Sequence, residues 1–446
     1  MGRLFGTDGV RGVANKELSA ELAYKLGRAG AYILTKGKIG GKILIGRDTR
    51  ISGQMLEAAL AAGICSVGCD AVLLDVVPTP GVAFLTKDLQ ADAGVVISAS
   101  HNPAADNGIK FFSSSGYKLS DELEDQIEEL INNGMDSIPS PVGAEVGRIY
   151  SLKEAEERYI KYIVSLSPVD FRGLKVVIDC ANGAASRISP EVFRRLGADV
   201  ITINNGPDGL NINVNCGSTH PEQLQREVIA CGADLGIAHD GDADRVIAVD
   251  HRGRVVDGDK IMAICGFNLL KRNALPHNTL VTTVMSNFGL DLAWQEAGGR
   301  LLKTQVGDRY VLEEMLKGGY SLGGEQSGHI IFLNHSTTGD GIITAVQLLA
   351  ACLAEGKPLA DLADLIPTLP QTLINVQVKD KSLVDRDEVI QGRIKELEKN
   401  LHGHGRILIR PSGTEPVVRV MVEGEDQQII EEIAKELADL IRDRLG

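Results

Sequence analysis

Three stretches rich in aliphatic and β-branched residues recur along the chain, and each is followed by a helical pattern: Lys42–Asp48, Leu174–Asp179 and Asn278–Val284. They lie roughly 130 and then roughly 105 positions apart, which is too far for a solenoid repeat and suits three successive α/β domains. A chain of 446 residues is also too long for one hydrophobic core, because single cores stop growing near about 250–300 residues. We therefore predict several domains, three of them α/β.

The last part of the chain has a different pattern. Short β-rich runs at Leu373–Val378, Arg406–Arg410 and Val417–Val422 alternate with two helical patterns, which predicts a smaller α+β domain. Stretches rich in Gly, Pro or turn residues at 132–147, 251–258 and 367–370 separate these parts. We expect four domains, at residues 1–150, 151–256, 257–368 and 369–446.

Composition narrows the class of function. The net charge is −14 at pH 7 and aromatic residues are 4% of the chain, which argues against binding nucleic acid or an anionic membrane surface and favours a small-molecule ligand. The apolar stretch Ile342–Ala354 is too short to span a bilayer and predicts a buried helix. Seven cysteines without a Cys-x-x-Cys pair, and a start without a signal-peptide core, indicate a reducing cytoplasm.

Three aspartates, Asp240, Asp242 and Asp244, follow directly after the apolar run Leu235–Ala238. Carboxylates a few ångströms apart repel one another by roughly 1–4 kcal/mol per pair, so the loop favours a bound cation. Oxygen ligands indicate Mg²⁺, Ca²⁺ or Mn²⁺ rather than zinc.

The run leaves several alternatives open. It does not fit an EF-hand, because Arg245 stands at the sixth loop position and His251 at the twelfth. A strand followed by Asp-x-Asp is also typical of aspartyl-phosphate phosphatases, in which Asp240 would be the nucleophile. A solvated acidic turn is the third interpretation.

A second candidate loop, Ser98–Pro103, follows the strand-like run Gly94–Ile97. Ligands usually bind where strands end at the carboxyl edge of an α/β sheet. Ser100 beside His101 is either a catalytic pair or part of a turn stabilised by its Asn-Pro sequence. Further on, Lys110 lies in a partly apolar strand, where it is either a proton-transfer group or a lysine with a packed stem and a solvated head.

Three further segments carry polar groups that could hold a phosphosugar. In Gly323–His329, a glycine-rich turn, Glu325 could accept hydrogen bonds from vicinal sugar hydroxyls. Arg410–Pro416 combines a guanidinium, two hydroxyls and a glycine as a possible phosphate cradle, with Arg419 on the next strand. The N-terminal turn Phe5–Gly12 adds Arg11. Each of these segments is equally consistent with a structural turn.

Taken together and in this order, the serine loop, the aspartate run, the Gly-Glu-Gln-Ser-Gly-His turn and the Arg-Pro-Ser-Gly-Thr-Glu-Pro turn resemble the four signature loops of the α-D-phosphohexomutases. The resemblance spans nearly the whole chain. It implies three related mixed α/β domains and a smaller α+β C-terminal domain around one central cleft, each contributing one loop. The chain is most similar to the bacterial branch that acts on glucosamine phosphates, on the evidence of Phe5–Gly12, Ile97–Phe112, Val306–Val311, Gln326 and Gly328.

The resemblance implies interconversion of glucosamine 6-phosphate and glucosamine 1-phosphate through a phosphoserine at Ser100 and a 1,6-bisphosphate that also primes the enzyme, supplying amino-sugar nucleotide and cell-wall precursor synthesis. One Mg²⁺ per chain would be held by the three aspartates and the phosphate on Ser100. The implied catalytic residues are Ser100, His101, Lys110, Arg11 and Arg245. The implied substrate-binding residues are Glu325, Ser327, Arg410, Ser412, Gly413, Thr414 and Arg419. The family also leads us to expect a cytoplasmic protein, possibly a homodimer.

Three alternatives remain at this point. A phosphoglucomutase or phosphomannomutase of the same fold would share the loops, because the sugar loop contacts hydroxyls common to these substrates. An aspartyl-phosphate enzyme would use Asp240 in place of Ser100. A protein that binds metal and sugar phosphate without turnover would keep the loops but not the reaction.

Overall fold

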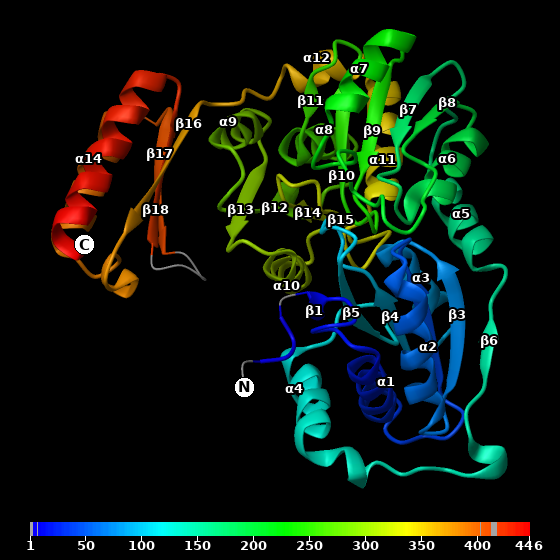
Figure 1. The fold of residues 1–446 in the computed structure, drawn as a ribbon. Coiled ribbons are helices and arrows are strands. Elements are labelled where there is room, and N and C mark those ends of the chain that lie inside the picture. Colours follow the sequence, from blue (N-terminus) through cyan, green and yellow to red (C-terminus); the bar gives the residue numbers. More distant parts are fainter. Residues whose placement is uncertain (1–2, 7, 402, 412–416) are drawn as a thin grey trace. The chain divides into compact units, whose positions relative to one another are not determined.

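The computed structural model describes residues 3–6, 8–401, 403–411 and 417–446. The chain forms two compact units, Met1–Met285 with Gly299–Asp364, and Ser286–Gly298 with Leu365–Gly446. The described residues form four β-sheets with helices between the strands, which confirms the predicted mixed α/β fold. In Figure 1 the three sheets of the first unit follow one another along the colour gradient from blue to yellow.

The first sheet has the order β1-β5-β4-β2-β3-β6. Residues along β2 alternate between its two faces, so Ile43 and Ile45 belong to one hydrophobic cluster and Leu44 to another. Helices therefore cover both faces, and β4 is buried along its whole length. The elements of this part of the chain are β1 (Val10–Val13), α1 (Ala20–Leu34), β2 (Lys42–Arg47), α2 (Ser52–Cys65), β3 (Asp70–Val76), α3 (Thr79–Asp88), β4 (Ala93–Ile97), β5 (Asp106–Ser113), α4 (Asp121–Glu129) and β6 (Ile149–Ser151).

The second sheet has the order β11-β10-β9-β7-β8. Its central strands β7 and β9 are parallel, and β10 returns antiparallel beside β9. The tight β9–β10 connection carries the three aspartates. The elements are α5 (Ala155–Ser165), β7 (Lys175–Asp179), α6 (Ala185–Arg195), β8 (Asp199–Ile203), α7 (Glu222–Cys231), β9 (Leu235–His239), β10 (Val246–Asp250) and β11 (Val255–Val256).

The third sheet, of order β13-β12-β14-β15, completes the first unit. The apolar stretch predicted to be a buried helix lies in α11, most of which is buried. The elements are α8 (Gly258–Lys271), β12 (Thr279–Thr283), β13 (Arg300–Thr304), α10 (Asp308–Gly318), β14 (Leu322–Gly324), β15 (Ile330–Phe332), α11 (Gly341–Glu355) and α12 (Leu359–Ala363).

The second unit is built on a three-stranded antiparallel sheet of order β16-β18-β17. Helix α14 covers one face of this sheet (Figure 1), and its apolar side packs into the same cluster as Val418, Val420 and Val422. The elements are α9 (Phe288–Glu296), β16 (Gln371–Gln377), α13 (Glu388–Asn400), β17 (Gly405–Pro411), β18 (Val417–Gly424) and α14 (Gln427–Leu445).

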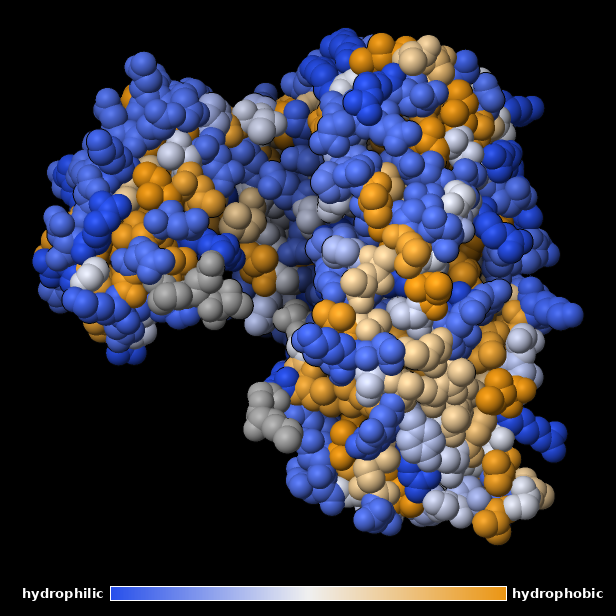
Figure 2. Space-filling model, viewed as in Figure 1, coloured by the Kyte–Doolittle hydropathy of each residue, from blue (hydrophilic) through white to orange (hydrophobic). Residues whose placement is uncertain are grey.

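Within the first unit, several predicted loops leave the carboxyl ends of strands. The serine loop follows β4, the aspartate loop follows β9, and the Glu325 turn follows β14. Because such ends are where α/β sheets bind ligands, the fold favours convergence of these loops. In the part of the chain that the structure describes, no helix has the length and apolar character needed to cross a membrane. Polar residues cover much of the face in Figure 2, interrupted by apolar areas over the first sheet.

Candidate active site

Ser100 lies at the start of the loop after β4, and its side chain is directed at the aspartate loop. It is buried and has a φ of 53°, in the left-handed region that residues with a side chain rarely adopt. Its Oγ donates to Asp240 Oδ2 at 2.5 Å and lies 3.4 Å from His101 Nδ1. The predicted nucleophile, the neighbouring histidine and the acidic loop therefore meet.

Four hydrogen bonds hold the backbone on either side of Ser100. Ser98 Oγ accepts from the Ser100 N–H at 3.0 Å. Arg50 Nη2 donates to the carbonyls of Ser100 and Asn102 at 3.1 and 2.6 Å. Asn213 Nδ2, from the second domain, donates to the Ser100 carbonyl at 2.9 Å. The unusual backbone conformation is thus stabilised from both domains.

The carboxylates of Asp240, Asp242 and Asp244 are buried, with ligand atoms within 4.8 Å of one another. Asp242 Oδ1 and Asp244 Oδ1 have no hydrogen-bond partner among the described residues. Buried unpaired carboxylate oxygens are costly, and an all-oxygen donor set suits Mg²⁺. Burial, and then the charges of the other two aspartates, raise the pKa of Asp240 well above its usual range. The residues present therefore fit a divalent cation.

A glycine is required within the aspartate loop. A Cβ on Gly241 would lie 2.6 Å from the Ser100 carbonyl oxygen. Any side chain here would push the serine loop away from the aspartates, so the glycine allows Ser100 and Asp240 to approach.

Basic groups surround the acidic cluster. Lys110 is 3% exposed, and its Nζ lies 3.4 Å from Asp242 Oδ2. Arg245 Nε lies 3.8 Å from Asp244 Oδ1. Burial, and then the charges of Arg245 and Arg11, lower the pKa of His101. A neutral imidazole beside cationic groups suits a region that receives phosphate.

Arg11 completes this basic region. Its Nη2 donates to Asp8 Oδ2 at 3.0 Å, whereas its Nε is buried and has no hydrogen-bond partner in the described part of the chain. Arg11 therefore keeps a donor available for an anion near His101.

The turn after β14 lies against the aspartate loop. Glu325 Oε1 accepts from the Gly307 N–H at 3.0 Å, and the Gly328 carbonyl accepts from the Val246 N–H at 3.1 Å. His329 Nδ1 lies 3.5 Å from Asp244 Oδ2. The candidate sugar-binding carboxylate is therefore held close to the metal loop, and Ser327 on the same turn is exposed.

The predicted phosphate cradle belongs to the second unit. Arg410 on β17 and Arg419 on β18 are directly opposite each other in the antiparallel ladder. Ser412, Gly413 and Thr414 lie outside the described residues.

Models of the phosphoglucomutase/phosphomannomutase family match the chain in four consecutive segments. The α/β/α domains I, II and III match residues 2–137, 157–253 and 257–369, and the C-terminal domain matches residues 373–440. The chain belongs to this family.

Curated relatives extend the match over the full length. Proteins named phosphoglucosamine mutase from Symbiobacterium thermophilum and Acetivibrio thermocellus are 60% and 59% identical, each over 100% of both chains. One from Clostridium novyi is 56% identical over 100% of this chain and 99% of its own. The family and these relatives indicate an isomerase that transfers a phosphoryl group.

Solved structures of the family share the fold. A phosphoglucomutase/phosphomannomutase family protein from Burkholderia thailandensis is 25% identical and has a TM-score of 0.83, with 99% of this chain and 97% of that one covered. N-acetylphosphoglucosamine mutase from Aspergillus fumigatus, in complex with GlcNAc-6P and magnesium, is 18% identical with a TM-score of 0.68, covering 99% and 96%. At that identity the second comparison supports the fold alone.

In this phosphohexomutase, sequence motifs missed several residues that hold the site together. Thr79, Asn213 and the Asp48–Arg50 ion pair all contact the serine or aspartate loop. In the sequence Thr79 is marked only by its place between two prolines, Pro78 and Pro80. Asn213 carries no signal beyond that of an ordinary turn residue.

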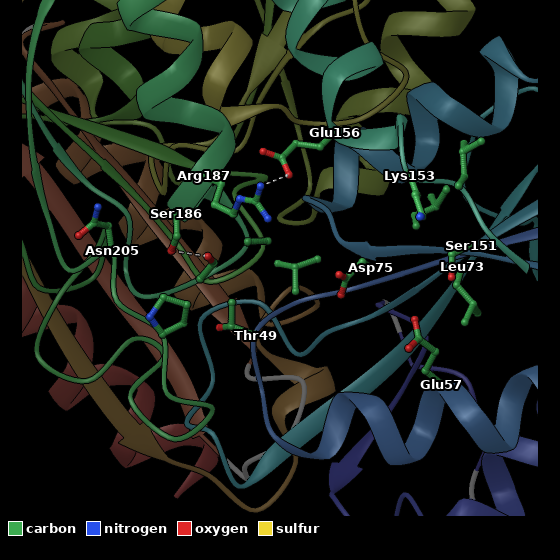
Figure 3. A pocket seen from close by; sticks show the side chains of 16 residues that line it. Thr49, Glu57, Leu73, Asp75, Ser151, Lys153, Glu156, Ser186, Arg187 and Asn205 are labelled. Carbon is green, nitrogen blue, oxygen red and sulfur yellow. Dashed lines mark hydrogen bonds and ion pairs between the residues drawn. The ribbon is translucent and has the colours of Figure 1, made fainter.

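A cavity of about 630 Å³ is lined by residues from the first and second sheets and the segments that connect their strands (Figure 3). The Arg187–Glu156 ion pair, at 3.4 Å, lines it, and Thr49 forms part of its wall. None of the described candidate site residues lines this cavity, so it is separate from the site at Ser100.

Proposed function

We propose that the chain interconverts glucosamine 6-phosphate and glucosamine 1-phosphate through a phosphoserine at Ser100. The observation that carries the proposal is the 2.5 Å contact between Ser100 Oγ and Asp240 Oδ2, made across 140 positions of sequence. It joins a hydroxyl to a buried acidic cluster in a chain 56–60% identical to relatives named phosphoglucosamine mutase. A hydroxyl held against a cation site is the arrangement that reversible phosphoryl transfer requires.

The proposed reaction has two transfers. The bond from phosphorus to Ser100 Oγ breaks as a bond from phosphorus to sugar O1 forms, and the O1 proton leaves to a nearby base. The resulting 1,6-bisphosphate reorients, and its 6-phosphoryl group returns to Ser100 while O6 regains a proton. Lys110 is our candidate for the proton transfer, with His101 as a second group.

Asp240, Asp242 and Asp244, with the phosphate on Ser100, would hold one Mg²⁺, which when bound offsets negative charge on the transferring phosphoryl group. Arg245 and Arg11 would add positive charge beside it. The buried oxygens Asp242 Oδ1 and Asp244 Oδ1, which have no hydrogen-bond partner among the described residues, support this assignment.

The remaining residues would bind the part of the substrate that does not react. Glu325 and Ser327 would hold ring hydroxyls in both orientations of the sugar. The distal phosphate would be held by Arg410, Ser412, Gly413, Thr414 and Arg419. Because these residues would bind the distal phosphate equally well in both orientations of the sugar, the phosphate that faces Ser100 is the one that reacts.

Replacing Ser100 tests the nucleophile. We expect Ser100→Ala to lower kcat/KM for glucosamine 6-phosphate by at least about 10³-fold, because the phosphoryl acceptor is lost. Peptide mass spectrometry of the wild type should find one phosphate on the 98–103 loop. Ser115→Ala, which removes an exposed serine, is the matched control and should stay within ~2-fold of the wild type. Phosphate on Asp240, lost in mild base, would instead support the aspartyl-phosphate mechanism.

The sugar is tested separately. We expect kcat/KM to be highest for glucosamine 6-phosphate when it is compared with the glucose and mannose 6-phosphates, each primed with its bisphosphate. Preference for glucose or mannose would assign the chain to another branch of the family. Binding of substrate without turnover would indicate a silent binding protein.

We also propose that the enzyme works in the cytoplasm. All seven cysteines are free, which supports a reducing compartment. We infer a homodimer from the family, and light scattering of the purified chain tests that inference.

A further inference from the structure

Thr79, the first residue of α3, binds the aspartate loop through two groups. Its backbone N–H donates to the Asp242 carbonyl at 3.0 Å, and its Oγ1 donates to Asp242 Oδ2 at 2.6 Å. Thr79 is 1% exposed and lies 163 positions from its partner. One residue of the first domain therefore fixes both the backbone and the side chain of an aspartate in the second.

The two oxygens of the Asp242 carboxylate have different surroundings. Oδ2 accepts from Thr79 Oγ1 and lies 3.4 Å from Lys110 Nζ. Oδ1 is buried and has no hydrogen-bond partner within the described residues. The carboxylate is thus held through Oδ2, and Oδ1 is left without a hydrogen bond on a member of the buried Asp240, Asp242 and Asp244 cluster, whose ligand atoms lie within 4.8 Å of one another.

We propose that Thr79 is a positioning residue of the metal centre. Its hydroxyl holds the Asp242 carboxylate in the rotamer that presents Oδ1 to a divalent cation, and it thereby makes metal affinity depend on the contact between the first two domains. Loss of a hydrogen-bond partner that fixes the orientation of a metal ligand commonly weakens metal binding by about 10- to 100-fold. The proposal rests on the metal site of the proposed function and is independent of the sugar.

The same helix supplies a matched control. Thr86 is also buried, but its Oγ1 donates at 2.7 Å to the Val82 carbonyl one turn back in α3. Replacing either threonine by valine keeps the side-chain shape and removes one hydroxyl. Thr79→Val removes the donor to Asp242, whereas Thr86→Val removes a bond that stays within the helix.

The experiment compares Thr79→Val, Thr79→Ser and Thr86→Val in the full-length chain, with the phosphorylation of Ser100 matched by mass spectrometry. Mn²⁺ binding is measured by calorimetry and by electron paramagnetic resonance. We expect Thr79→Val to weaken Mn²⁺ binding at least about 10-fold, and Thr79→Ser and Thr86→Val to remain within ~3-fold of the wild type. Saturating Mg²⁺ should restore most of the kcat of Thr79→Val.

Two outcomes would overturn the inference: wild-type Mn²⁺ affinity in Thr79→Val, or equal weakening in Thr86→Val, which would indicate a general effect of disturbing α3. If Thr79→Val does not fold, Thr79→Ala is measured in its place against the same criteria. A wild type that binds Mn²⁺ but is never phosphorylated at Ser100 would refute the proposed reaction and leave this inference standing. A wild type that binds no Mn²⁺ would refute both.

Discussion

At the scale of single residues, the site depends on holding Ser100 in a backbone conformation that it would not adopt alone. A left-handed φ at a residue with a side chain costs of order 1 kcal/mol or more, and it persists only where the surroundings impose it. Arg50 from the first domain and Asn213 from the second both donate to the Ser100 carbonyl, at 3.1 and 2.9 Å. The serine is thus fixed relative to both domains before any substrate binds.

Replacing Asn213 by glycine tests this fixation. Asn213 itself has a φ of 60°, so Asn213→Gly keeps the backbone conformation and removes only the side-chain donor. We expect kcat to fall about 10²-fold with KM within ~3-fold, because misplacement of a reacting group by about 1 Å costs this much in rate. Steady-state kinetics at saturating Mg²⁺ measures both constants.

Asn215 provides the control for that change. It is exposed and also has a left-handed φ, of 51°, so Asn215→Gly repeats the chemical change away from Ser100. Its kcat should match the wild type. A kcat for Asn213→Gly as high as that of Asn215→Gly would show that the carbonyl contact does not position the nucleophile.

The sequence indicates some residues of the site but not those that hold them in place, such as Thr79 and Asn213. Ser100 and the three aspartates could be proposed from the sequence because each motif directly follows an apolar run and because the four loops occur in a family order. Thr79 and Asn213 could not, because each is one ordinary polar residue whose partner lies 163 or 113 positions away. Only the packing of the first domain against the second reveals such pairs.

At the scale of elements, the three β-rich stretches were predictable and are the strands β2, β7 and β12. The place of α9 was not predictable, because it lies between β12 and β13 in the chain and yet belongs to the second compact unit. Asn287, at its N-terminus, donates to the Leu369 carbonyl at 3.0 Å. A single side chain of this kind leaves no periodic pattern in the sequence.

Helix α11 supports the aspartate loop through its N-terminus. Asp340 accepts from the backbone N–H groups of residues 342 and 343, and the Gly341 N–H donates to the Ala243 carbonyl at 3.0 Å. Tyr159 Oη donates to Asp340 Oδ2 at 2.5 Å. Burial raises the pKa of Asp340 to about 6, although the helix N–H groups and Tyr159 oppose the shift.

This pKa predicts a pH-dependent stability that Asp340→Asn removes. Because the folded pKa of about 6 exceeds the ordinary 3.8, the stabilising contribution is complete below about pH 4 and is lost as pH rises to 6. Asn can still accept from the helix N–H groups through Oδ1. The difference in stability, variant minus wild type, should therefore increase by about 2 kcal/mol between pH 4 and pH 7.

Calorimetric melting of the wild type and of Asp340→Asn from pH 4 to pH 7, in the presence of a chelator, measures this difference. The pH dependence that other carboxylates give to both proteins cancels in the subtraction. The expected sign is a Tm gain of Asp340→Asn over the wild type that grows with pH. A difference that stays constant with pH would mean that Asp340 is ionised throughout, and that burial does not control its titration.

At the scale of the whole molecule, ion pairs join the first and third sheets within the first unit. Lys118, after β5, pairs with Asp308 at the start of α10 and with Asp8 Oδ1 at 3.1 Å. Arg309 Nη1 donates to Asp121 Oδ1 at 2.6 Å. Asp308 Oδ2 also lies 3.6 Å from Nε2 of His329, the residue that faces the aspartate loop. These contacts connect the stability of the first unit to the geometry of its site.

Lys118→Met should therefore destabilise the first unit. The methionine keeps an apolar stem of similar length but removes the lysine shared by Asp8 and Asp308, leaving Asp8 with Arg11 alone. Removing one partner from a largely buried pair costs about 3 kcal/mol or more. We expect the calorimetric Tm of the full chain to fall by roughly 5 °C. Lys25→Met, which breaks an exposed pair between Lys25 and Glu21 one helical turn apart, should change the Tm by less than ~1 °C. Equal changes in the two variants would show that the Lys118 pairs are no stronger than surface pairs, and that packing alone joins the two sheets.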